Sequence, residues 1–413
     1  MMSKEKRRVP KLRFPGFTED WEQRKFNDLF KERREKTIKE NEETLLSCAI
    51  TGIYLNSELF SHFRGSSTIG YLKIKKYDLI LSAQNLHLGN ANINLFFENG
   101  MISPAYKVFE LKSIDPYFIN AWVKKDATKN FFLKATTEGA SQCRKNIEWD
   151  VLLNQEIPVP NNLEQIAIGK FINKLDMNIT LHQRKLNNLK LKKKALLQKL
   201  FPKNEERYPE LRFPGFSDAW EQCKLSVLAT MNARIGWQNL RTSEFLDNGD
   251  YLLITGTDFD NGRIKYSTCH YVEKKRFDQD TKIQLSTGSI LITKDGTLGK
   301  VALVEELPKP ATLNAGVFNV RVKDDAFLSY KYLYHYLKAP FLMKYVTANA
   351  TGGTIKHLNQ SILVDFPIPI TGKQEQDRIA KLLDSLESII TLHQRKLDHL
   401  QLQKKALLQQ MFV

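Results

Sequence analysis

The chain contains the same short blocks twice, once in each half, and this duplication constrains its fold more than any other feature. The stretches between the repeated blocks have no obvious similarity to each other. We therefore expect a duplicated frame that carries two different inserts. The repeated blocks are Leu-Arg-Phe-Pro-Gly-Phe at 12–17 and 211–216, Trp-Glu-Gln at 21–23 and 220–222, Thr-Leu-His-Gln-Arg-Lys-Leu at 180–186 and 391–397, and Lys-Lys-Ala-Leu-Leu-Gln at 193–198 and 404–409.

Length and composition indicate a globular protein with more than one domain. The chain has 413 residues, which is long for a single ordinary domain, and 42% of them are hydrophobic. Its four cysteines show no C-x-x-C spacing, so we expect neither a disulfide framework nor a cysteine-based zinc site. This cysteine usage fits a reducing cytosol, and no stretch has the length of an apolar membrane span. We expect a cytoplasmic protein.

The charge of the chain favours a polyanionic partner. The formal net charge is +16 and the sequence pI is near 9.4. Residues 163–203 carry ten lysine and arginine residues against two acidic ones, so the excess is concentrated in one segment. Nucleic acid is the first expectation for the partner and anionic lipid the second. A solvated charged helix face is the simpler alternative for this run.

The long segments at 168–200 and 379–411 have the pattern of paired helices. Apolar residues recur at alternating spacings of four and three over more than four heptads, in the same slots of both copies. We expect the two helices to pair with each other in an antiparallel coiled coil, and pairing with another chain is the alternative. The seam positions are 168, 172, 175, 179, 182, 186, 189, 193, 196 and 200, and each of these plus 211 in the second copy.

Four polar residues interrupt these seams at matching positions. His182 and His393 are expected to fix the register of the helix pair, which is the usual role of a polar seam residue. Lys193 and Lys404 are expected to extend out of the seam toward solvent. A metal or catalytic role for the histidines is the weaker alternative.

The inserts have the pattern of mixed α/β domains. Residues 77–82 and 289–293 are expected to form equivalent strands, helices are expected to start near Asp115 and Asp325, and proline-rich strands are expected to close the inserts at 157–160 and 366–369. The predicted fold class is α+β, with two domains on an antiparallel helix pair related by a pseudo-twofold axis. The predicted segments are 1–160 (first domain), 161–203 (first spacer helix), 204–370 (second domain) and 371–413 (second spacer helix).

An antiparallel helix pair would separate the two inserts by a fixed distance. A helix over 168–200 is about 50 Å long at 1.5 Å per residue. The inserts would then lie at opposite ends of the pair and could contact DNA at sites separated by about one helical turn, ~34–36 Å. Because the inserts differ in sequence, we expect a target with two unlike parts.

These features together resemble the specificity subunit of type I restriction–modification systems (the HsdS family), over essentially the whole chain. The resemblance rests on the order and duplication of the Leu-Arg-Phe-Pro-Gly-Phe and Trp-Glu blocks, of Ile-Pro-Val-Pro (157–160) and Phe-Pro-Ile-Pro (366–369), and of Glu-Gln at 164–165 and 375–376. The resemblance implies that each insert is a target recognition domain for one part of a split DNA sequence. It also implies that the helices bind two adenine-N6 methyltransferase subunits and that restriction/translocase subunits join the complex.

Catalytic motifs are not evident in the sequence. Residues 296–300 (Gly-Thr-Leu-Gly-Lys) lack the spacing of a phosphate-binding loop, and Asp115-Pro116-Tyr117 lacks the second proline of an adenine methyltransferase motif. No H-E-x-x-H motif or nuclease carboxylate group stands out. We therefore expect a non-catalytic subunit without a metal or cofactor of its own, with S-adenosylmethionine and ATP bound by its partner subunits.

Polar, glycine-containing loops in the two inserts are the candidates for DNA contact, because base edges are read by polar and basic side chains. Ordinary surface turns are the alternative, and Asn146 and Asn359 could instead cap a helix or turn. Residues 234–239 and Arg64 are weaker candidates. The candidate residues are Gln84, Asn85, His87, Asn90, Ser141, Gln142, Arg144, Lys145 and Asn146 in the first insert, and Lys294, Thr297, Thr354, Lys356, His357 and Asn359 in the second.

Two other functions remain open from the sequence. The chain could be a coiled-coil scaffold whose inserts bind proteins and have no DNA specificity. It could also be a self-contained methyltransferase or nuclease, against which the missing motifs count. Selection of bound DNA from random duplexes distinguishes a DNA-specific protein from a scaffold, because a scaffold would enrich no motif. Binding of the methyl donor by the purified chain would favour a self-contained methyltransferase.

Overall fold

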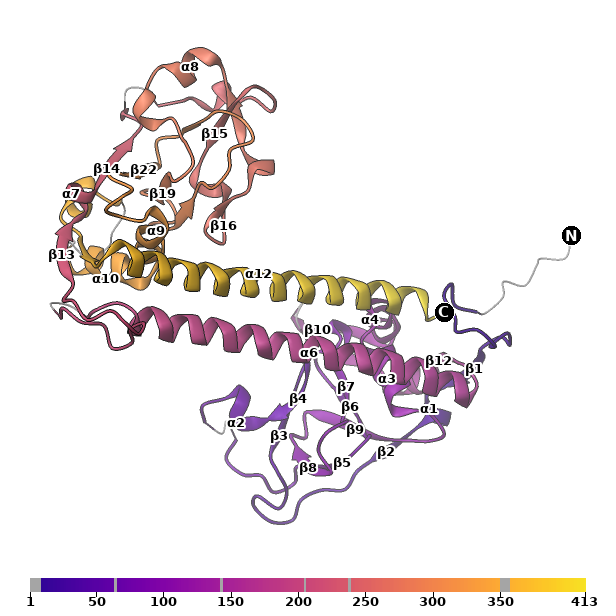
Figure 1. The fold of residues 1–413 in the computed structure, drawn as a ribbon. Helices are drawn as coiled ribbons and strands as arrows, with labels where there is room; N and C mark the ends of the chain where they lie inside the picture. Colours follow the sequence, from indigo (N-terminus) through magenta and orange to yellow (C-terminus); the bar gives the residue numbers. More distant parts are fainter. Residues whose placement is uncertain (1–8, 63–64, 142–143, 204–205, 237–238, 350–356) are drawn as a thin grey trace, which may run out of the picture. The chain divides into compact units, whose positions relative to one another are not determined.

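The chain forms two compact units (Figure 1). The computed structural model describes residues 9–62, 65–141, 144–203, 206–236, 239–349 and 357–413. The first unit consists of Met1–Lys185 and His393–Val413, and the second consists of Leu186–Leu392. Each unit therefore combines one insert with the start of one long helix and the end of the other.

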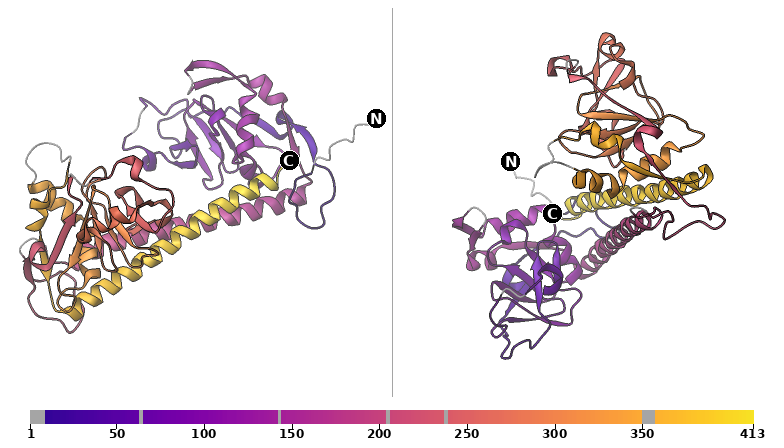
Figure 2. Two further views of the ribbon diagram at one scale, coloured as in Figure 1. Left: turned by 90° about the horizontal axis from the view of Figure 1, so that it is seen from above. Right: turned by 90° about the vertical axis from the view of Figure 1, so that its left-hand side faces the viewer.

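The long helices are α6 (Asn162–Lys199) and α12 (Lys373–Gln410), and they pair antiparallel (Figures 1 and 2). In the first unit, Asp176 of α6 forms an ion pair with Lys404 of α12 at 2.6 Å, and His182 Nδ1 lies 3.1 Å from His393 Nδ1. Residue numbers rise along α6 as they fall along α12, which defines the antiparallel direction. The predicted intramolecular pairing is confirmed.

Every predicted seam position on both helices is buried or half-buried. The prediction that the seam lysines extend into solvent is wrong. Lys193 forms an ion pair with Glu387 in the second unit, and Lys404 forms the equivalent pair with Asp176 in the first. An acidic residue on the facing helix keeps each ammonium group at the helix pair, because it compensates the charge there.

The first and last strands of each insert pair with each other. In the first unit β1 (Glu22–Lys25) is antiparallel to β12 (Glu156–Val159), and in the second β13 (Glu221–Lys224) is antiparallel to β23 (Pro367–Ile370). The proline-rich strands that were predicted at the ends of the inserts are confirmed. This pairing holds the two ends of an insert together just before the chain enters a long helix.

Both inserts contain a four-stranded antiparallel sheet with the same order of equivalent strands. The strands predicted over 77–82 and 289–293 occupy the same place in their sheets and are confirmed. The sheets are β2 (Phe30–Arg33), β9 (Tyr106–Leu111), β6 (Leu79–Ser82) and β7 (Ala91–Ile93) in the first unit, and β14 (Ala229–Ala233), β22 (Val317–Val322), β19 (Ile290–Thr293) and β20 (Val301–Leu303) in the second.

The remaining strands differ between the inserts. In the second insert, a central strand is parallel to one neighbour and antiparallel to the other, and the first insert has only antiparallel pairs among its described strands. The first insert adds β3 (Leu46–Ala49) with β4 (Gly52–Leu55), β5 (Leu72–Lys75) with β8 (Asn99–Ile102), and β10 (Thr136–Ser141) with β11 (Arg144–Ile147). The second adds β15 (Tyr251–Ile254) between β18 (His270–Val272) and β21 (Ala311–Leu313), and β16 (Phe259–Asp260) with β17 (Arg263–Ile264).

One predicted helix start is confirmed and one is wrong. The Asp115 carboxylate accepts hydrogen bonds from the backbone N–H groups of Tyr117 and Phe118 and caps α3 (Pro116–Val123). Its counterpart α9 begins at Tyr330, not near Asp325. The carboxylate of Asp324 accepts a hydrogen bond from the Ala326 N–H and forms a turn before the helix.

Short helices complete each insert. Those of the first are α1 (Phe26–Leu29), α2 (Asn56–Leu59), α3, α4 (Asp126–Leu133) and α5 (Trp149–Asn154). Those of the second are α7 (Leu225–Leu228), α8 (Lys274–Asp278), α9 (Tyr330–Lys338), α10 (Pro340–Asn349) and α11 (Gln360–Val364).

The repeated Leu-Arg-Phe-Pro-Gly-Phe block joins the two long helices within each unit. In the first unit the Leu12 N–H donates to the carbonyl of Gln410 at the end of α12, at 2.8 Å. Arg13 forms two hydrogen bonds of 2.7 Å with the carboxylate of Glu164 at the start of α6. Leu211 and Arg212 make the same contacts in the second unit, with Lys199 and Glu375.

The repeated tryptophans pack the ends of the long helices into the cores of the units. The Trp21 ring lies 5.8 Å from Phe118 of α3 and 6.0 Å from Phe412, just after α12. In the second unit the Trp220 ring lies 6.3 Å from Tyr332 of α9 and 6.4 Å from Phe201, just after α6. Both tryptophans are almost completely buried, so burial of these aromatic rings stabilises the frame.

Candidate nucleic-acid interface

In the first unit, the two polar segments predicted to contact DNA lie next to each other. β6 ends at Ser82, which is opposite the start of β9, and residues 83–90 follow as a loop. The backbone N–H of Lys145 in β11 donates to the carbonyl of Gln84 in this loop, at 3.4 Å. The loop 83–90 and the strands β10 and β11 therefore lie next to each other in one surface, which we call the first loop edge.

The predicted contact residues of the first loop edge differ in accessibility. Gln84 and Asn146 are exposed, and Asn85, His87 and Lys145 are half-buried. For Ser141 and Arg144 the structure describes the strands β10 and β11 but not the side chains, and Gln142 lies outside the described residues.

Asn90 lies inside the domain. Its side-chain oxygen is 3.4 Å from both Cys48 Sγ and the Asn92 amide nitrogen, and the residue is buried. Hydrogen bonds of this kind satisfy a buried amide, so Asn90 anchors the end of the loop 83–90 to the interior of the domain. Base contact by Asn90 stays a prediction, and its burial does not favour it.

His87 has hydrogen-bonding capacity that the described part of the chain does not use. Neither of its ring nitrogens has a hydrogen-bond partner among the described residues, although both are covered. Burial and the nearby charge of Lys145 lower the pKa of His87 below its ordinary value. The ring is therefore neutral at physiological pH and offers one donor and one acceptor.

In the second unit, three loops gather at the end of β19. The backbone N–H of Lys294 donates to the Gly316 carbonyl at 2.9 Å, and the Lys294 carbonyl accepts from the Leu358 N–H at 2.9 Å. These bonds join residues 294–299, 314–316 and 357–359 in a surface that we call the second loop edge. It brings together described residues of the two segments that were predicted from the sequence of this insert, of which residues 351–356 lie outside the described part of the chain.

The predicted residues of the second loop edge are mostly accessible. Thr297, His357 and Asn359 are exposed, and Lys294 is half-buried with its ammonium group 5.6 Å from the centre of the Phe318 ring. His357 Nδ1 lies 2.5 Å from the Asp295 carboxylate. Thr354 and Lys356 lie outside the described residues, as do Trp237, Gln238 and Arg64 among the weaker candidates.

Two asparagines were also considered as caps. Asn359 occupies the N-cap position of α11, but its side chain makes no capping hydrogen bond, so its amide remains at the surface. Asn146 lies within β11, opposite Thr137, and caps no helix. Both side chains stay candidates for DNA contact.

Arg234, another weaker candidate, is a buried support of the second loop edge. Its Nε donates to the Leu313 carbonyl at 2.8 Å, and a terminal nitrogen donates to the Thr312 hydroxyl at 3.3 Å. Burial lowers the pKa of this guanidinium. These contacts fix the strand that precedes residues 314–316, so Arg234 can position the edge but is covered from direct contact.

A further loop, which was not predicted from the sequence, lies at the second loop edge. A Cβ on Gly256 would lie 2.9 Å from the Thr293 methyl group, so the turn after β15 lies against the end of β19. The Asn314 N–H donates to the Ile254 carbonyl at 2.9 Å and joins the same region. Thr255 and Thr257 belong to this turn. Residues 251–254 are a short continuous apolar run, and a run of this kind does not show that β15 pairs with the distant β21.

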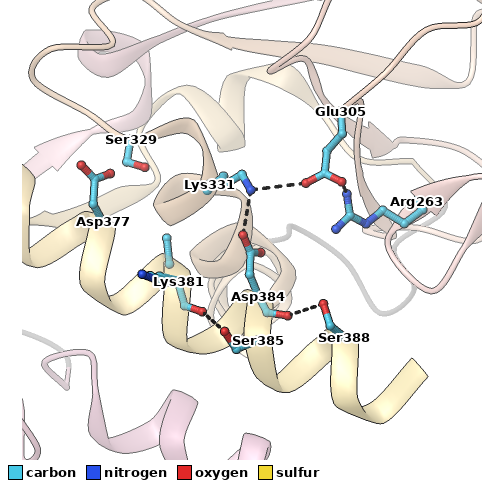
Figure 3. Close-up of a pocket in the computed structure, with 10 residues that line it drawn as sticks. Arg263, Glu305, Ser329, Lys331, Asp377, Lys381, Asp384, Ser385 and Ser388 are labelled. Atoms are coloured by element: carbon cyan, nitrogen blue, oxygen red, sulfur yellow. Dashed lines mark hydrogen bonds and ion pairs between the residues drawn. The ribbon is translucent and has the colours of Figure 1, made fainter. Parts of the chain in front are cut away.

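A polar cavity of about 430 Å³ lies elsewhere in the second unit, where the domain meets α12 (Figure 3). Lys331 lies 2.9 Å from the Asp384 carboxylate and 3.5 Å from that of Glu305, which also pairs with Arg263. The opposite charges on the walls compensate one another, so the cavity has no strong preference for an anion or a cation.

Among the described residues, no three or more His, Cys, Asp or Glu side chains are grouped so that they could hold a metal ion. A search of the same residues for a helix long and apolar enough to cross a membrane finds none.

Comparison with known proteins places this arrangement in a family. The family described as "Type I restriction modification DNA specificity domain" matches residues 18–191 and 218–402. The MjaVIII specificity subunit of a type I restriction enzyme from Methanocaldococcus jannaschii is 22% identical over 96% of this chain and 92% of its own length. The EcoR124I/EcoR124II specificity subunit from Escherichia coli is 25% identical over 35% of this chain and 36% of its own.

Solved structures show the same fold. The S subunit of a type I restriction–modification system from M. genitalium aligns with a TM-score of 0.62 and 15% identity, covering 98% of this chain and 99% of that one. A chain from a study of complex assembly and conformational transition of the type I system aligns with a TM-score of 0.52, 17% identity and the same coverage. The chain, with its two matched domains and its two long helices, belongs to the family of type I restriction–modification specificity subunits.

Proposed function

We propose that the chain binds double-stranded DNA and selects a target with two unlike parts, one for each loop edge. The observation that carries this proposal is the duplicated frame with two different sets of polar side chains at equivalent strand ends. Such side chains can read base edges, and basic residues can contact phosphates. The net charge of +16 supports a polyanionic partner.

The proposal assigns direct contacts to the accessible residues of both edges. On the first edge these are Gln84, Asn85, His87, Lys145 and Asn146, and on the second they are Lys294, Thr297, His357 and Asn359. Amide side chains suit adenine, and lysine suits guanine or phosphate.

The same proposal makes the long helices the docking surface for two copies of one methyltransferase subunit. Outside the seam, leucines at repeated positions of α6 and α12 are exposed to solvent. Exposed apolar side chains at repeated positions support two equivalent binding sites. They are Leu181 (48% exposed) and Leu191 (64%) on α6, and Leu392 (67%) and Leu402 (69%) on α12.

The chain itself would not catalyse a reaction. In the proposed complex it would hold the DNA, while the methyltransferase subunits bind S-adenosylmethionine and flip the target adenine. Restriction/translocase subunits would bind ATP and join the same assembly. The alternative is a scaffold whose loop edges bind proteins and show no preference for DNA sequence.

Selection from random duplexes tests DNA recognition. The complex of this chain with its methyltransferase partners is mixed with random-sequence duplexes, and the bound fraction is separated by mobility shift and sequenced. We expect an enriched motif with two unlike parts at a fixed spacing, and binding that weakens steeply with salt. Failure of any motif to enrich would favour the scaffold.

Paired substitutions test the docking surface. Leu181→Glu with Leu402→Glu alters the first unit, and Leu191→Glu with Leu392→Glu alters the second. We expect each pair to remove one methyltransferase copy, since a carboxylate in an apolar contact is costly. Native mass spectrometry of the complex measures the stoichiometry. Retention of both copies by both variants would show that the partner binds elsewhere.

A further inference from the structure

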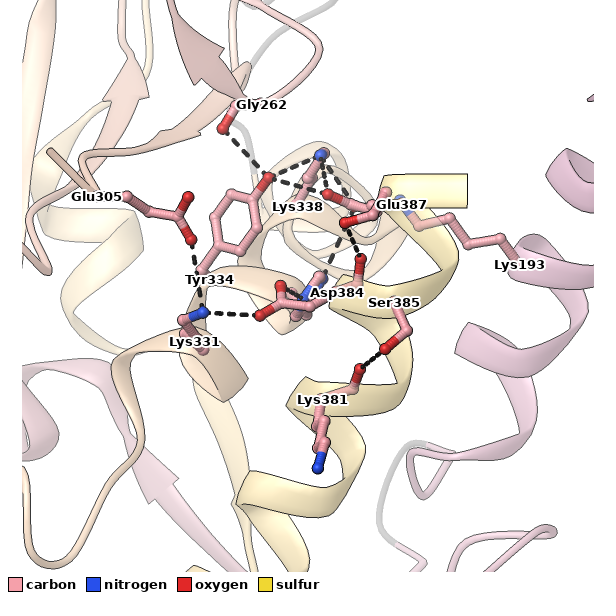
Figure 4. A network of polar contacts seen from close by, with 12 residues as sticks. Lys193, Gly262, Glu305, Lys331, Tyr334, Lys338, Lys381, Asp384, Ser385 and Glu387 are labelled. Carbon is pink, nitrogen blue, oxygen red and sulfur yellow. Dashed lines mark hydrogen bonds and ion pairs between the residues drawn. The ribbon is translucent and has the colours of Figure 1, made fainter. Parts of the chain in front are cut away.

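A network of charged side chains lies inside the second unit, where α9 packs on the long helices (Figure 4). His335 Nε2 lies 2.8 Å from the Asp384 carboxylate of α12. Lys338 Nζ lies 2.9 and 3.1 Å from the two oxygens of Glu387, and the Tyr334 hydroxyl lies 2.7 Å from Lys338 Nζ. The network thus connects a recognition-domain helix to one particular segment of α12.

This network is buried, so its partners must match. The His335 side chain is 1% exposed, and that of Glu387 is 13% exposed. Burial opposes ionisation of Glu387, but Lys338 and Lys193 hold its pKa below the ordinary value. Burial likewise opposes ionisation of Asp384, yet hydrogen bonds from His335 and Lys331 lower its pKa to about 2. Removing the Asp384 carboxylate would leave the buried His335 without its ionic partner.

The equivalent place in the first unit can be identified from shared contacts. The backbone N–H of Asp115 donates to the Gln165 side chain, and that of Ser329 donates to Gln376, both at 2.9 Å. These residues directly precede α3 and α9. Aligning the two helices from these contacts places Ala121 at the position of His335 and Lys124 at that of Lys338.

The long helices differ at the matching positions. The repeat offset of 211 residues places Asn173 at the position of Asp384 and Asp176 at that of Glu387. The first unit therefore has Ala121 and Asn173 where the second has the His335–Asp384 pair. The ammonium group of Lys124 is 2.8 Å from the Ile50 carbonyl, within its own domain.

We propose that these residues form a matching code that assigns each recognition domain to its own helix segment. A second domain placed on the start of α6 would have His335 facing Asn173, without its carboxylate partner. A first domain placed on the start of α12 would leave the half-buried Asp384 beside Ala121, without its histidine partner. The partner that each helix segment accepts is thus a recognition domain with the matching residue on its α3 or α9 helix.

A double-mutant cycle in the full chain tests the code. Asp384→Asn removes the carboxylate from the buried His335, and His335→Ala removes the buried histidine from Asp384. Each substitution alone should lower the unfolding temperature of the second unit by about 5–10 °C. The double variant H335A/D384N recreates the residue pair of the first unit and should recover most of this loss. Equal or additive losses in the double variant would overturn the proposal.

The first unit provides the reciprocal experiment. Asn173→Asp should destabilise that unit, and adding Ala121→His should restore part of the loss. Hydrogen exchange followed by mass spectrometry reports α3 and α9 separately, so each effect can be located. An N173D variant as protected as the wild type would contradict the code.

A domain exchange tests the assignment itself. Residues 12–159 are replaced by a second copy of residues 211–370, in the presence and absence of N173D/D176E on α6. The resident second unit carries H335A/D384N, so that its α9 peptides differ in mass from those of the transplanted copy. We expect exchange protection of the transplanted α9 only with the two substitutions on α6. Equal protection in both backgrounds would overturn the proposal. The assignment of domains to helix segments depends on packing within each unit. It can therefore fail while DNA recognition holds, and DNA recognition can fail while the assignment holds.

Discussion

The two units have the same frame but different contents. The four-stranded sheet has the same strand order in both, and the first and last strands of each insert pair in the same way. The additional strands are antiparallel pairs in the first insert and include a parallel pair in the second. The repeated blocks therefore encode the contacts between each domain and the long helices, and the inserts are free to differ elsewhere.

Buried ion pairs at the start of each long helix are the strongest test of this shared frame. The Glu164 and Glu375 side chains are 0% and 1% exposed, and each is paired with an arginine of the repeated block. Glu375→Gln should destabilise the second unit by about 3–5 kcal/mol, because the arginine loses its compensating charge. Hydrogen exchange of both units in chemical denaturant measures the effect.

Glu164→Gln is the matched control for that experiment. We expect it to destabilise the first unit by a similar amount and to change the second unit little. Equal destabilisation of both units by either variant would mean that the two frames unfold together and are not independent repeats.

Substitutions in the two loop edges should affect recognition of different parts of the DNA target. Gln84→Ala with Asn146→Ala alters the first edge, and Thr297→Ala with His357→Ala alters the second. Each base contact that is lost should weaken binding of the complex to its DNA target by about 1–3 kcal/mol. Fluorescence anisotropy with duplexes substituted in one part or the other measures this.

The expected pattern is specific to each variant. A first-edge variant should lose discrimination in one part of the target and keep it in the other, and a second-edge variant should show the opposite. Loss of discrimination in both parts by each variant would contradict the assignment of one edge to one part.

The smallest expected effect is the contribution of the His182–His393 pair to the pH dependence of stability. Because His182 Nδ1 and His393 Nδ1 lie 3.1 Å apart, one ring donates and the other must accept with a neutral nitrogen. Burial, His393 and the nearby lysines 185 and 396 lower the pKa of His182 below its ordinary value of 6.5. Its contribution to stability is therefore complete above pH 6.5 and decreases as the pH falls below that value.

Replacement of both histidines tests this contribution. Wild type and His182→Asn with His393→Asn are compared by thermal unfolding of the full chain between pH 7.5 and 5.5. The wild type should lose more stability on acidification than the variant, which keeps polar neutral side chains at the seam. Identical pH profiles would remove the histidine pair as the cause.

The sequence predicted the parts of the fold that depend on local pattern or on the repeat. The heptad spacing identified α6 and α12, and the length of their apolar seam predicted that they pair with each other. His182 and His393, which were expected to fix the register of the pair, are in contact. Features that depend on distant partners were not predictable. Examples are the parallel pairing of β15 with β21 and the acidic partners that hold Lys193 and Lys404 at the helix pair.

The candidate site shows the same difference between features that follow from local sequence and features that depend on distant contacts. Polar loop composition identified both loop edges, but composition does not distinguish an exposed amide from a buried one. Gln84 is exposed and Asn90 is buried by contacts with Cys48 and Asn92. Arg234 carries the positive charge expected of a residue that contacts DNA. It is buried, however, and its hydrogen bond to the Leu313 carbonyl holds the neighbouring loop in place.

Sequencing of N6-methyladenine in cells that carry the complete methyltransferase complex is the most direct test of the account. The wild-type chain is compared with T297A/H357A in the same cells, and with cells that lack the gene. We predict a methylated motif with two unlike parts that disappears without the gene. In the variant only one part should become degenerate, and the other part and the spacing should persist. A motif with two identical halves, or one in which both parts change together, would contradict two independent recognition domains on one frame.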